Sequence, residues 1–162
     1  MIKLFAALIV MLSMCLAACE KRAATTAPEA SEAATPPAPA PAGLPRTPSP
    51  AGARVFFITP ADGDTVSGPV MIEFGIEGME VVKAGTDQPD SGHHHLLIDA
   101  DLPDLNLPIP ADANYIHFGD GSTSTEISLS PGSHTLRMLL GDHRHVPHDP
   151  PVMSDIIAIT AQ

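Results

Sequence analysis

Residues 69–78 read PVMIEFGIEG and show the pattern that decides the fold. Large apolar residues occupy every second position after Pro69, and the positions between them begin with Met71 and Glu73. The apolar positions are Val70, Ile72, Phe74 and Ile76. Successive side chains of a β-strand point to opposite faces, so this alternation predicts a strand with one buried and one exposed face.

Similar short segments continue along the chain on both sides of this strand. Turn-forming clusters such as PADGD (60–64) and SPG (130–132) separate them, and no ten-residue stretch has the apolar spacing of an amphipathic helix. The further segments are RVFFIT (54–59), HHHLLID (93–99), YIHFG (115–119), STEISL (124–129), SHTLRMLL (133–140) and SDIIAIT (154–160). About seven short strands in a domain of this length predict an all-β fold, an immunoglobulin-like β-sandwich.

The chain opens with the features of an exported protein. Lys3 precedes an apolar run, Leu4 to Ala18, of about fifteen residues, which is too short to span a bilayer and has the form of a secretory signal. The run ends Leu16-Ala17-Ala18-Cys19, which resembles the lipobox of bacterial lipoproteins. The resemblance implies a signal peptide over residues 1–18 and membrane attachment by a lipid on the thiol of Cys19. Glu20 then favours the outer membrane, with the domain facing the periplasm.

Residues 23–53 consist largely of Ala, Pro, Thr and Ser and hold few large apolar side chains. Such a composition buries too little surface to offset the entropy of ordering, and its proline favours extended polyproline II backbone. We therefore expect the lipidated cysteine and a linker over residues 19–53, followed by one domain over residues 54–162. Because the chain has two cysteines, Cys15 and Cys19, that domain contains no thiol, disulfide or thiolate metal site.

The charge of the domain argues against two classes of partner. Residues 54–162 hold four Lys and Arg against sixteen Asp and Glu. A negative surface of this size repels nucleic acid and anionic lipid headgroups, so neither is an expected partner. The same charge is compatible with cation binding, and it is equally compatible with a role in solubility alone.

All eight histidines lie between residues 93 and 148. Since residues i and i+2 of a strand share a face, His93 and His95 are expected to project together, roughly 6.5–7 Å apart, and His94 to point the other way. Imidazole nitrogens without thiolates suit Cu(II) or Zn(II). The sequence therefore predicts a copper or zinc site. Its expected ligands are His93, His95, His134, His145 and His148, with His117 as an additional candidate.

Other side chains are candidates for supporting roles at such a site. Carboxylates near the histidines are placed to accept the second N–H of a ligating ring, and two methionines offer thioether to Cu(I), although a strand methionine usually belongs to the core. The carboxylates are Asp99, Asp142 and Asp149, and the methionines are Met138 and Met153.

Several motifs together resemble a family of uncharacterised bacterial envelope domains. They are GHHHLLID (92–99), LPIP (107–110), IHFGDG (116–121), LSPGSHTLRMLLGD (129–142) and HVPHDPPVMSDIIAIT (145–160). The resemblance covers residues 54–162 and places seven of the eight histidines at patterned positions, with His143 at a variable one. The segment GDGSTSTE departs from the GQTE-like string expected after HFG. The resemblance implies no reaction, because the family has no established activity.

No catalytic motif is present, so we expect a binding domain and not an enzyme. The sequence lacks a GxSxG elbow, a glycine-rich phosphate loop and an HExxH helix. DADLPDLN (99–106) lacks the glycine and distal glutamate of an EF-hand. The alternative to metal binding is a structural or protein-interaction module in which the histidines form a polar network that fastens loops. A third possibility is a response to pH, since imidazoles titrate near neutrality.

Overall fold

The structure, a computed structural model, describes residues 43–162. The expected signal peptide, Cys19 and most of the expected linker lie outside the described residues. Nine strands form two sheets, and the described residues contain no helix. Within this part of the chain, no segment meets the length and hydropathy of a membrane-crossing helix. The predicted all-β sandwich is therefore confirmed.

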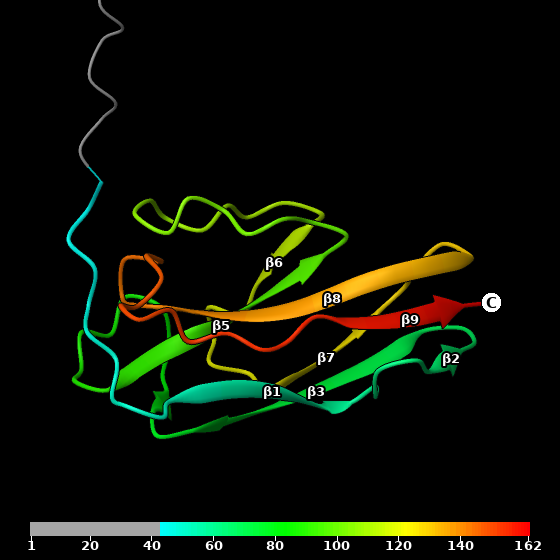
Figure 1. The fold of residues 1–162 in the computed structure, drawn as a ribbon, viewed down its shortest axis with the longest axis horizontal. Coiled ribbons are helices and arrows are strands. Elements are labelled where there is room, and N and C mark those ends of the chain that lie inside the picture. The colour runs from blue at the N-terminus through cyan, green and yellow to red at the C-terminus, as the bar shows by residue number, and fades with distance from the viewer. Residues whose placement is uncertain (1–42) are drawn as a thin grey trace, which may run out of the picture. The chain divides into compact units, whose positions relative to one another are not determined.

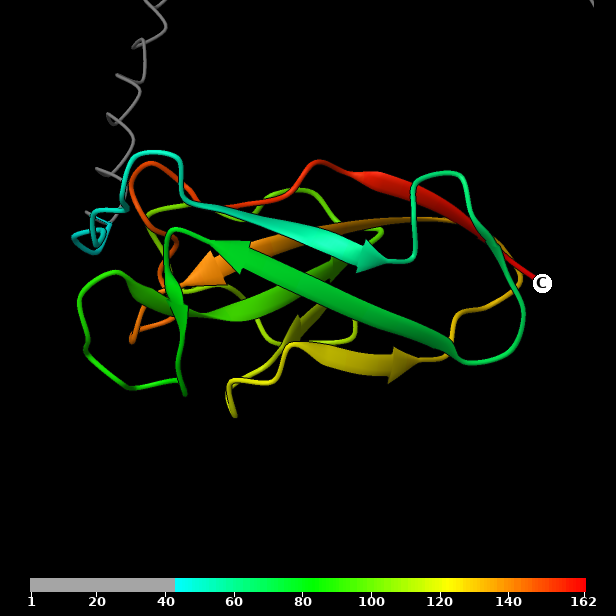
Figure 2. The same cartoon turned by 90° about the horizontal axis from the view of Figure 1, so that it is seen from below.

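The smaller sheet has three antiparallel strands in the order β1-β3-β7. They are β1 (Arg54–Thr59), β3 (Val70–Glu77) and β7 (Ser124–Ile127). The predicted alternation of β3 is confirmed, because Val70, Ile72 and Phe74 are buried while Met71 is half exposed. Figure 2 looks onto this sheet with the larger sheet behind it.

The larger sheet has the order β2-β9-β8-β5-β4, with β6 paired to β5. Its main strands are β5 (Ser91–Ile98), β6 (Tyr115–His117), β8 (Gly132–Gly141) and β9 (Ile157–Ala161). The two strands that were not predicted, β2 (Thr65–Val66) and β4 (Glu80–Val81), are only two residues long each. Both pair in parallel at the sheet margins, and such short bridges carry no periodic sequence signal.

Strand β5 is buried on both of its faces along its whole length. Its inner face packs in the core between the sheets, where Leu96 lies with Phe74 and Met138. Its outer face carries Leu97, which forms a second apolar cluster with Leu139 and Ile109. Ile109 belongs to the proline-rich crossing between β5 and β6, which lies over the outer face of the larger sheet (Figure 1). Polar residues of β5 are thus enclosed wherever they point.

The segment just before β1 also contacts the sandwich. Backbone bonds join Leu44 N to Asn106 O (2.8 Å) and Ser49 N to Asp149 O (3.1 Å). In Figure 1 this segment, in cyan, descends beside the loop that follows β8, in orange. The composition of residues 43–53 predicted linker, but hydrogen bonding to a distant loop makes them part of the folded unit.

Candidate metal centre

The alternation of β5 divides its three histidines between two environments. His93 and His95 lie on the outer face, and His94 lies on the inner face with its ring edge-on to Phe74 at 4.5 Å between centroids. All three side chains are fully buried. The predicted separation of His94 from the other two is therefore what the structure shows.

Four imidazole rings meet on the outer face of the larger sheet. His93 and His95 from β5 are joined by His117 from β6 and by His145 from the loop after β8. Their six centroid separations range from 4.7 Å to 5.9 Å, so every ring is close to every other. We call these four residues the histidine cluster.

The nitrogen atoms of three members lie at the spacing of metal ligands. His93, His95 and His117 each offer one ring nitrogen within 4.8 Å of the others. The Nε2 atoms of His93 and His95 are 3.1 Å apart. Zinc–nitrogen bonds of about 2.0–2.1 Å place two ligands of a tetrahedral ion about 3.3 Å apart, close to that separation. His145 does not belong to this set of three nitrogens, but the centroid of its ring lies 4.7–5.9 Å from the centroids of the other three rings.

Strand pairing and loop geometry bring the cluster together. His117 stands directly opposite His95 in the antiparallel pairing of β6 with β5. His93 stands opposite Gly141, the last residue of β8, so the chain that leaves β8 begins beside the cluster. His145 follows within that loop and has φ +68°, a left-handed conformation that few residues other than glycine adopt.

Two glycines leave the space that the rings occupy. A Cβ atom at Gly119 would lie 2.5 Å from Cε1 of His117, and one at Gly141 would lie 3.1 Å from Nε2 of His95. Neither glycine has a positive φ, so their role is space and not backbone conformation. In the motifs HFG and LLG the glycine therefore lies against a histidine ring, that of His117 and that of His95, and a larger residue would collide with it.

Burial favours the neutral form of His93, His95 and His117. Burial and, to a smaller extent, repulsion between neighbouring rings lower the pKa of His93 to about 3 and that of His95 to about 2. Burial and His145 also lower the pKa of His117, against the opposing charge of Asp120. A neutral imidazole is the form that binds metal, because its nitrogen lone pair is free.

Several nitrogens of the cluster lack protein partners. Nδ1 of His93, Nδ1 of His95 and Nε2 of His117 are buried without a hydrogen-bond partner among residues 43–162. A buried polar atom that makes no hydrogen bond costs about 1–3 kcal/mol. Leucine or valine at these positions would avoid that cost, so packing alone does not account for the histidines.

Residues 72–162 match the model of a protein family described as a domain of unknown function, DUF4399. The match spans more than half of the chain. The chain belongs to the DUF4399 family. No curated protein and no solved structure matches it. The expected membership of an uncharacterised domain family is thus confirmed, and all eight histidines lie inside the matched residues.

His134, a predicted ligand, lies outside the cluster of this DUF4399 domain. Its Nδ1 is 2.6 Å from Oδ2 of Asp99 and its Nε2 is 2.8 Å from the carbonyl oxygen of Ser130. The bond to Asp99 raises the pKa of His134. His95 of the cluster stands opposite Leu139, five residues along β8 from His134, so at least about 16 Å of strand separates His134 from the cluster.

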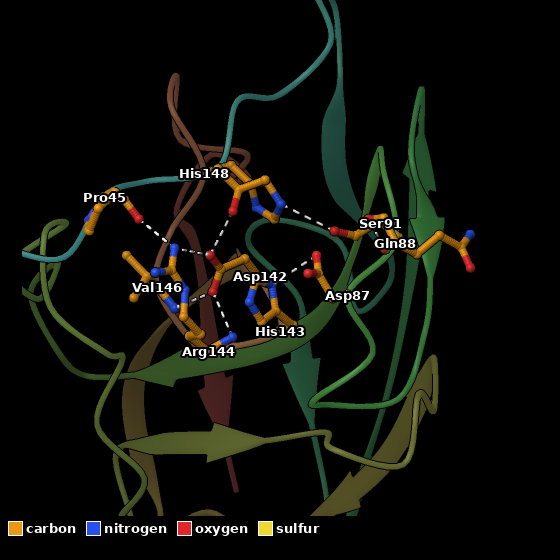
Figure 3. A network of polar contacts seen from close by, with 10 residues as sticks. Pro45, Asp87, Gln88, Ser91, Asp142, His143, Arg144, Val146 and His148 are labelled. Atoms are coloured by element: carbon orange, nitrogen blue, oxygen red, sulfur yellow. Dashed lines mark hydrogen bonds and ion pairs between the residues drawn. The ribbon is translucent and has the colours of Figure 1, made fainter.

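His148, also a predicted ligand, is fully buried but faces a different group. Its Nε2 is 3.1 Å from the carbonyl oxygen of Ser91, at the start of β5 (Figure 3). It therefore ties the loop after β8 to β5 and does not join the cluster. His143, at the variable position of the family pattern, lies 3.5 Å from the carboxylate of Asp87 at the surface.

The predicted supporting residues have other roles. Asp99 does orient an imidazole, but the imidazole is that of His134. Asp142 accepts bonds from the backbone of its own loop, and Asp149 is exposed and pairs with Arg46. Met138 belongs to the core between the sheets, and Met153 to the apolar cluster around Leu139. The DUF4399 centre thus presents only imidazole nitrogens within the described residues.

Proposed function

We propose that this domain binds one late transition metal ion, Cu(II) or Zn(II), through His93, His95 and His117, with His145 as the fourth ligand. The convergence of three imidazole nitrogens within 4.8 Å carries the proposal. Zinc and Cu(II) both accept an all-imidazole ligand set, whereas magnesium and calcium prefer oxygen. The domain acts as a metal buffer, chaperone or sensor and not as a catalyst.

The competing account is a histidine network with a purely structural role. The 3.1 Å contact between Nε2 of His93 and Nε2 of His95 fits a hydrogen bond between two neutral rings. That bond leaves Nε2 of His117 and both Nδ1 atoms without partners in the described part of the chain. An ion held by the two Nε2 atoms of His93 and His95 also accepts the lone pair of Nε2 of His117, which has no partner in the protein, and this favours metal binding.

Metal titration of the full chain without an affinity tag separates the two accounts. A ligand that binds only the native state stabilises it by about 2.7 kcal/mol at a hundredfold excess over Kd. We expect Cu(II) and Zn(II) to raise the urea midpoint at one ion per chain, Mg(II) to have no effect, and Cu(II) EPR to show nitrogen ligands.

Variants of the two partly exposed ligands identify the site. His117→Ala and His145→Ala should each weaken binding, while His134→Ala, outside the cluster, should leave it unchanged. The structural account is supported if no ion shifts the midpoint, or if all three variants bind as tightly as the wild type.

We also propose that the protein is a periplasm-facing lipoprotein of the outer membrane, attached through a lipid on Cys19. The Leu16-Ala17-Ala18-Cys19 segment, Glu20 and the Ala/Pro-rich stretch support this. The full chain should fractionate with outer membranes, and Cys19→Ser should move it to the soluble fraction. Recovery of the wild-type chain in the soluble fraction, and not with membranes, would argue against lipid attachment.

A further inference from the structure

We infer that Thr47 and Asp142 are positioning residues for His145, so that the segment at the end of the expected linker controls the fourth ligand of the metal centre. This inference rests on the proposed function. We call residues 44–47 the N-terminal strap. The strap contacts the loop after β8, residues 142–148, which is nearly a hundred positions away in sequence.

His145 needs positioning because its backbone is in an unfavourable conformation. Its φ of +68° belongs to the left-handed region, which is unfavourable for a residue with a side chain. The backbone of His145 makes two hydrogen bonds, one within the loop from His145 N to Asp142 O (2.8 Å) and one from Ile109 N of the β5–β6 crossing to His145 O (2.8 Å). Asp142 N also donates to Val146 O (2.9 Å), and the Asp142 side chain adds a further restraint.

Asp142 holds the loop on both sides of His145. It is 1 % exposed, and its Oδ1 accepts bonds from Arg144 N (2.8 Å) and Val146 N (3.0 Å). Those two amides flank His145 directly. A single buried carboxylate oxygen therefore constrains the residue before and the residue after the ligand (Figure 3).

The strap holds Asp142 in turn. Thr47 Oγ1 donates to Oδ2 of Asp142 at 2.7 Å, a shorter bond than the 3.3 Å contact that Arg144 Nη2 makes with the same oxygen. Thr47 also accepts from Asp149 N through its carbonyl (2.9 Å). Nearby, Arg46 Nε donates to Pro147 O (3.0 Å) and Arg144 Nη2 donates to Pro45 O (2.5 Å). The strap thus closes a chain of hydrogen bonds that runs from Thr47 through Asp142 to the backbone on both sides of His145.

The strap connects the loop that carries His145 to the segment that leads to the proposed membrane anchor. It lies within the Ala/Pro-rich residues 23–53, on the side away from the proposed lipid anchor at Cys19. Whatever displaces the strap also removes the hydroxyl that holds Asp142. Metal affinity is therefore coupled to the segment that leads to the membrane attachment.

The test uses the full tag-free chain and three substitutions. Thr47→Val removes the donor at nearly constant volume, Thr47→Ser retains a hydroxyl, and Ser49→Ala removes a neighbouring bond to Pro150 O (2.8 Å) without touching Asp142. Thr47→Val should weaken Cu(II) binding about tenfold, as expected for a lost bond to a charged group. Thr47→Ser and Ser49→Ala should bind like the wild type.

A double-mutant cycle with His145→Ala distinguishes positioning from general destabilisation. If Thr47 acts through His145, Thr47→Val changes the Cu(II) affinity of the His145→Ala chain by less than about twofold. An equal weakening in both backgrounds, or none in either, overturns the inference.

Hydrogen exchange of the metal-free chain supplies a readout that does not depend on binding. Thr47→Val should speed the exchange of backbone amides in residues 142–148, and Thr47→Ser should not. Unchanged exchange overturns the positioning role whatever the metal data show. If the wild-type chain binds no metal, the proposed function is overturned. Faster exchange in Thr47→Val would then still show that Thr47 holds the loop.

Discussion

At the scale of single residues, Gly119 determines whether the ring of His117 fits beside β5. A Cβ atom there would lie 2.5 Å from Cε1 of His117, so Gly119→Ala should displace the imidazole and weaken Cu(II) or Zn(II) binding at least tenfold. Gly75→Ala is the matched control, because its Cβ would meet Phe56 at the same 2.5 Å in the other sheet. It should cost stability and leave metal affinity unchanged. Equal affinity losses in the two variants would contradict the assignment.

His94 is a buried polar residue that the proposed site does not use. Neither of its ring nitrogens has a hydrogen-bond partner within residues 43–162, and burial lowers its pKa to about 4. His94→Leu removes two unpartnered polar atoms and keeps a similar volume, so it should stabilise the domain by about 1–3 kcal/mol in urea unfolding. His134→Leu, which loses two bonds, should destabilise it. A loss of stability in His94→Leu would show that the ring has a partner.

At the scale of elements, β5 makes the domain sensitive to acid. Burial lowers the pKa values of His93, His94 and His95 to about 3, 4 and 2, whereas the unfolded chain titrates near 6.5. Below pH 6.5 the unfolded state therefore binds protons that the folded state excludes. Unfolding free energy should fall by up to about 1.4 kcal/mol per pH unit for each of these histidines.

Urea unfolding of the metal-free chain at pH 7.5, 6.5 and 5.5 measures this loss. His94→Leu should show a shallower decline, because one of the three proton sites is gone. His134 acts in the opposite sense, since Asp99 raises its pKa and its stabilisation is lost as pH rises. Stability that stays constant from pH 7.5 to 5.5 would contradict the buried, neutral state of the β5 histidines.

At the scale of the whole molecule, the described residues contain no cysteine, so their two sheets are held together by the core. Phe74 joins the sheets through ring contacts with His94 (4.5 Å) and Phe118 (5.0 Å). Phe74→Ala should cost about 3–5 kcal/mol, a large part of the stability of a small domain. Phe56→Ala, on the outer side of β1, should cost less. Circular dichroism in urea measures both, and equal costs would argue against a core centred on Phe74.

The local pattern of the sequence was sufficient for the main strands and for the faces of their side chains. Alternation at residues 70–76 predicted the inner face of β3, and alternation at residues 93–98 placed His93 and His95 together and His94 apart. The same alternation in β8 aligns His134 with Leu136, Met138 and Leu140, on the core-facing side. Side-chain parity along a strand depends only on backbone geometry, so it is readable without the fold. Parity along one strand does not say which face of the sheet that strand shares with its neighbours, so it left His134 in the predicted ligand set.

Which histidines meet was decided only by the tertiary structure. The sequence offered His117 only as an additional ligand. It joins His93 and His95 because β6 pairs with β5 in the register that sets it opposite His95. His145 and not His148 reaches the cluster because Asp142 and Thr47 hold one left-handed residue within the loop. Such pairings and loop conformations depend on contacts between segments up to a hundred residues apart. No local pattern of residues encodes them, whereas a strand and its two faces require only the alternation of apolar and polar residues along the sequence.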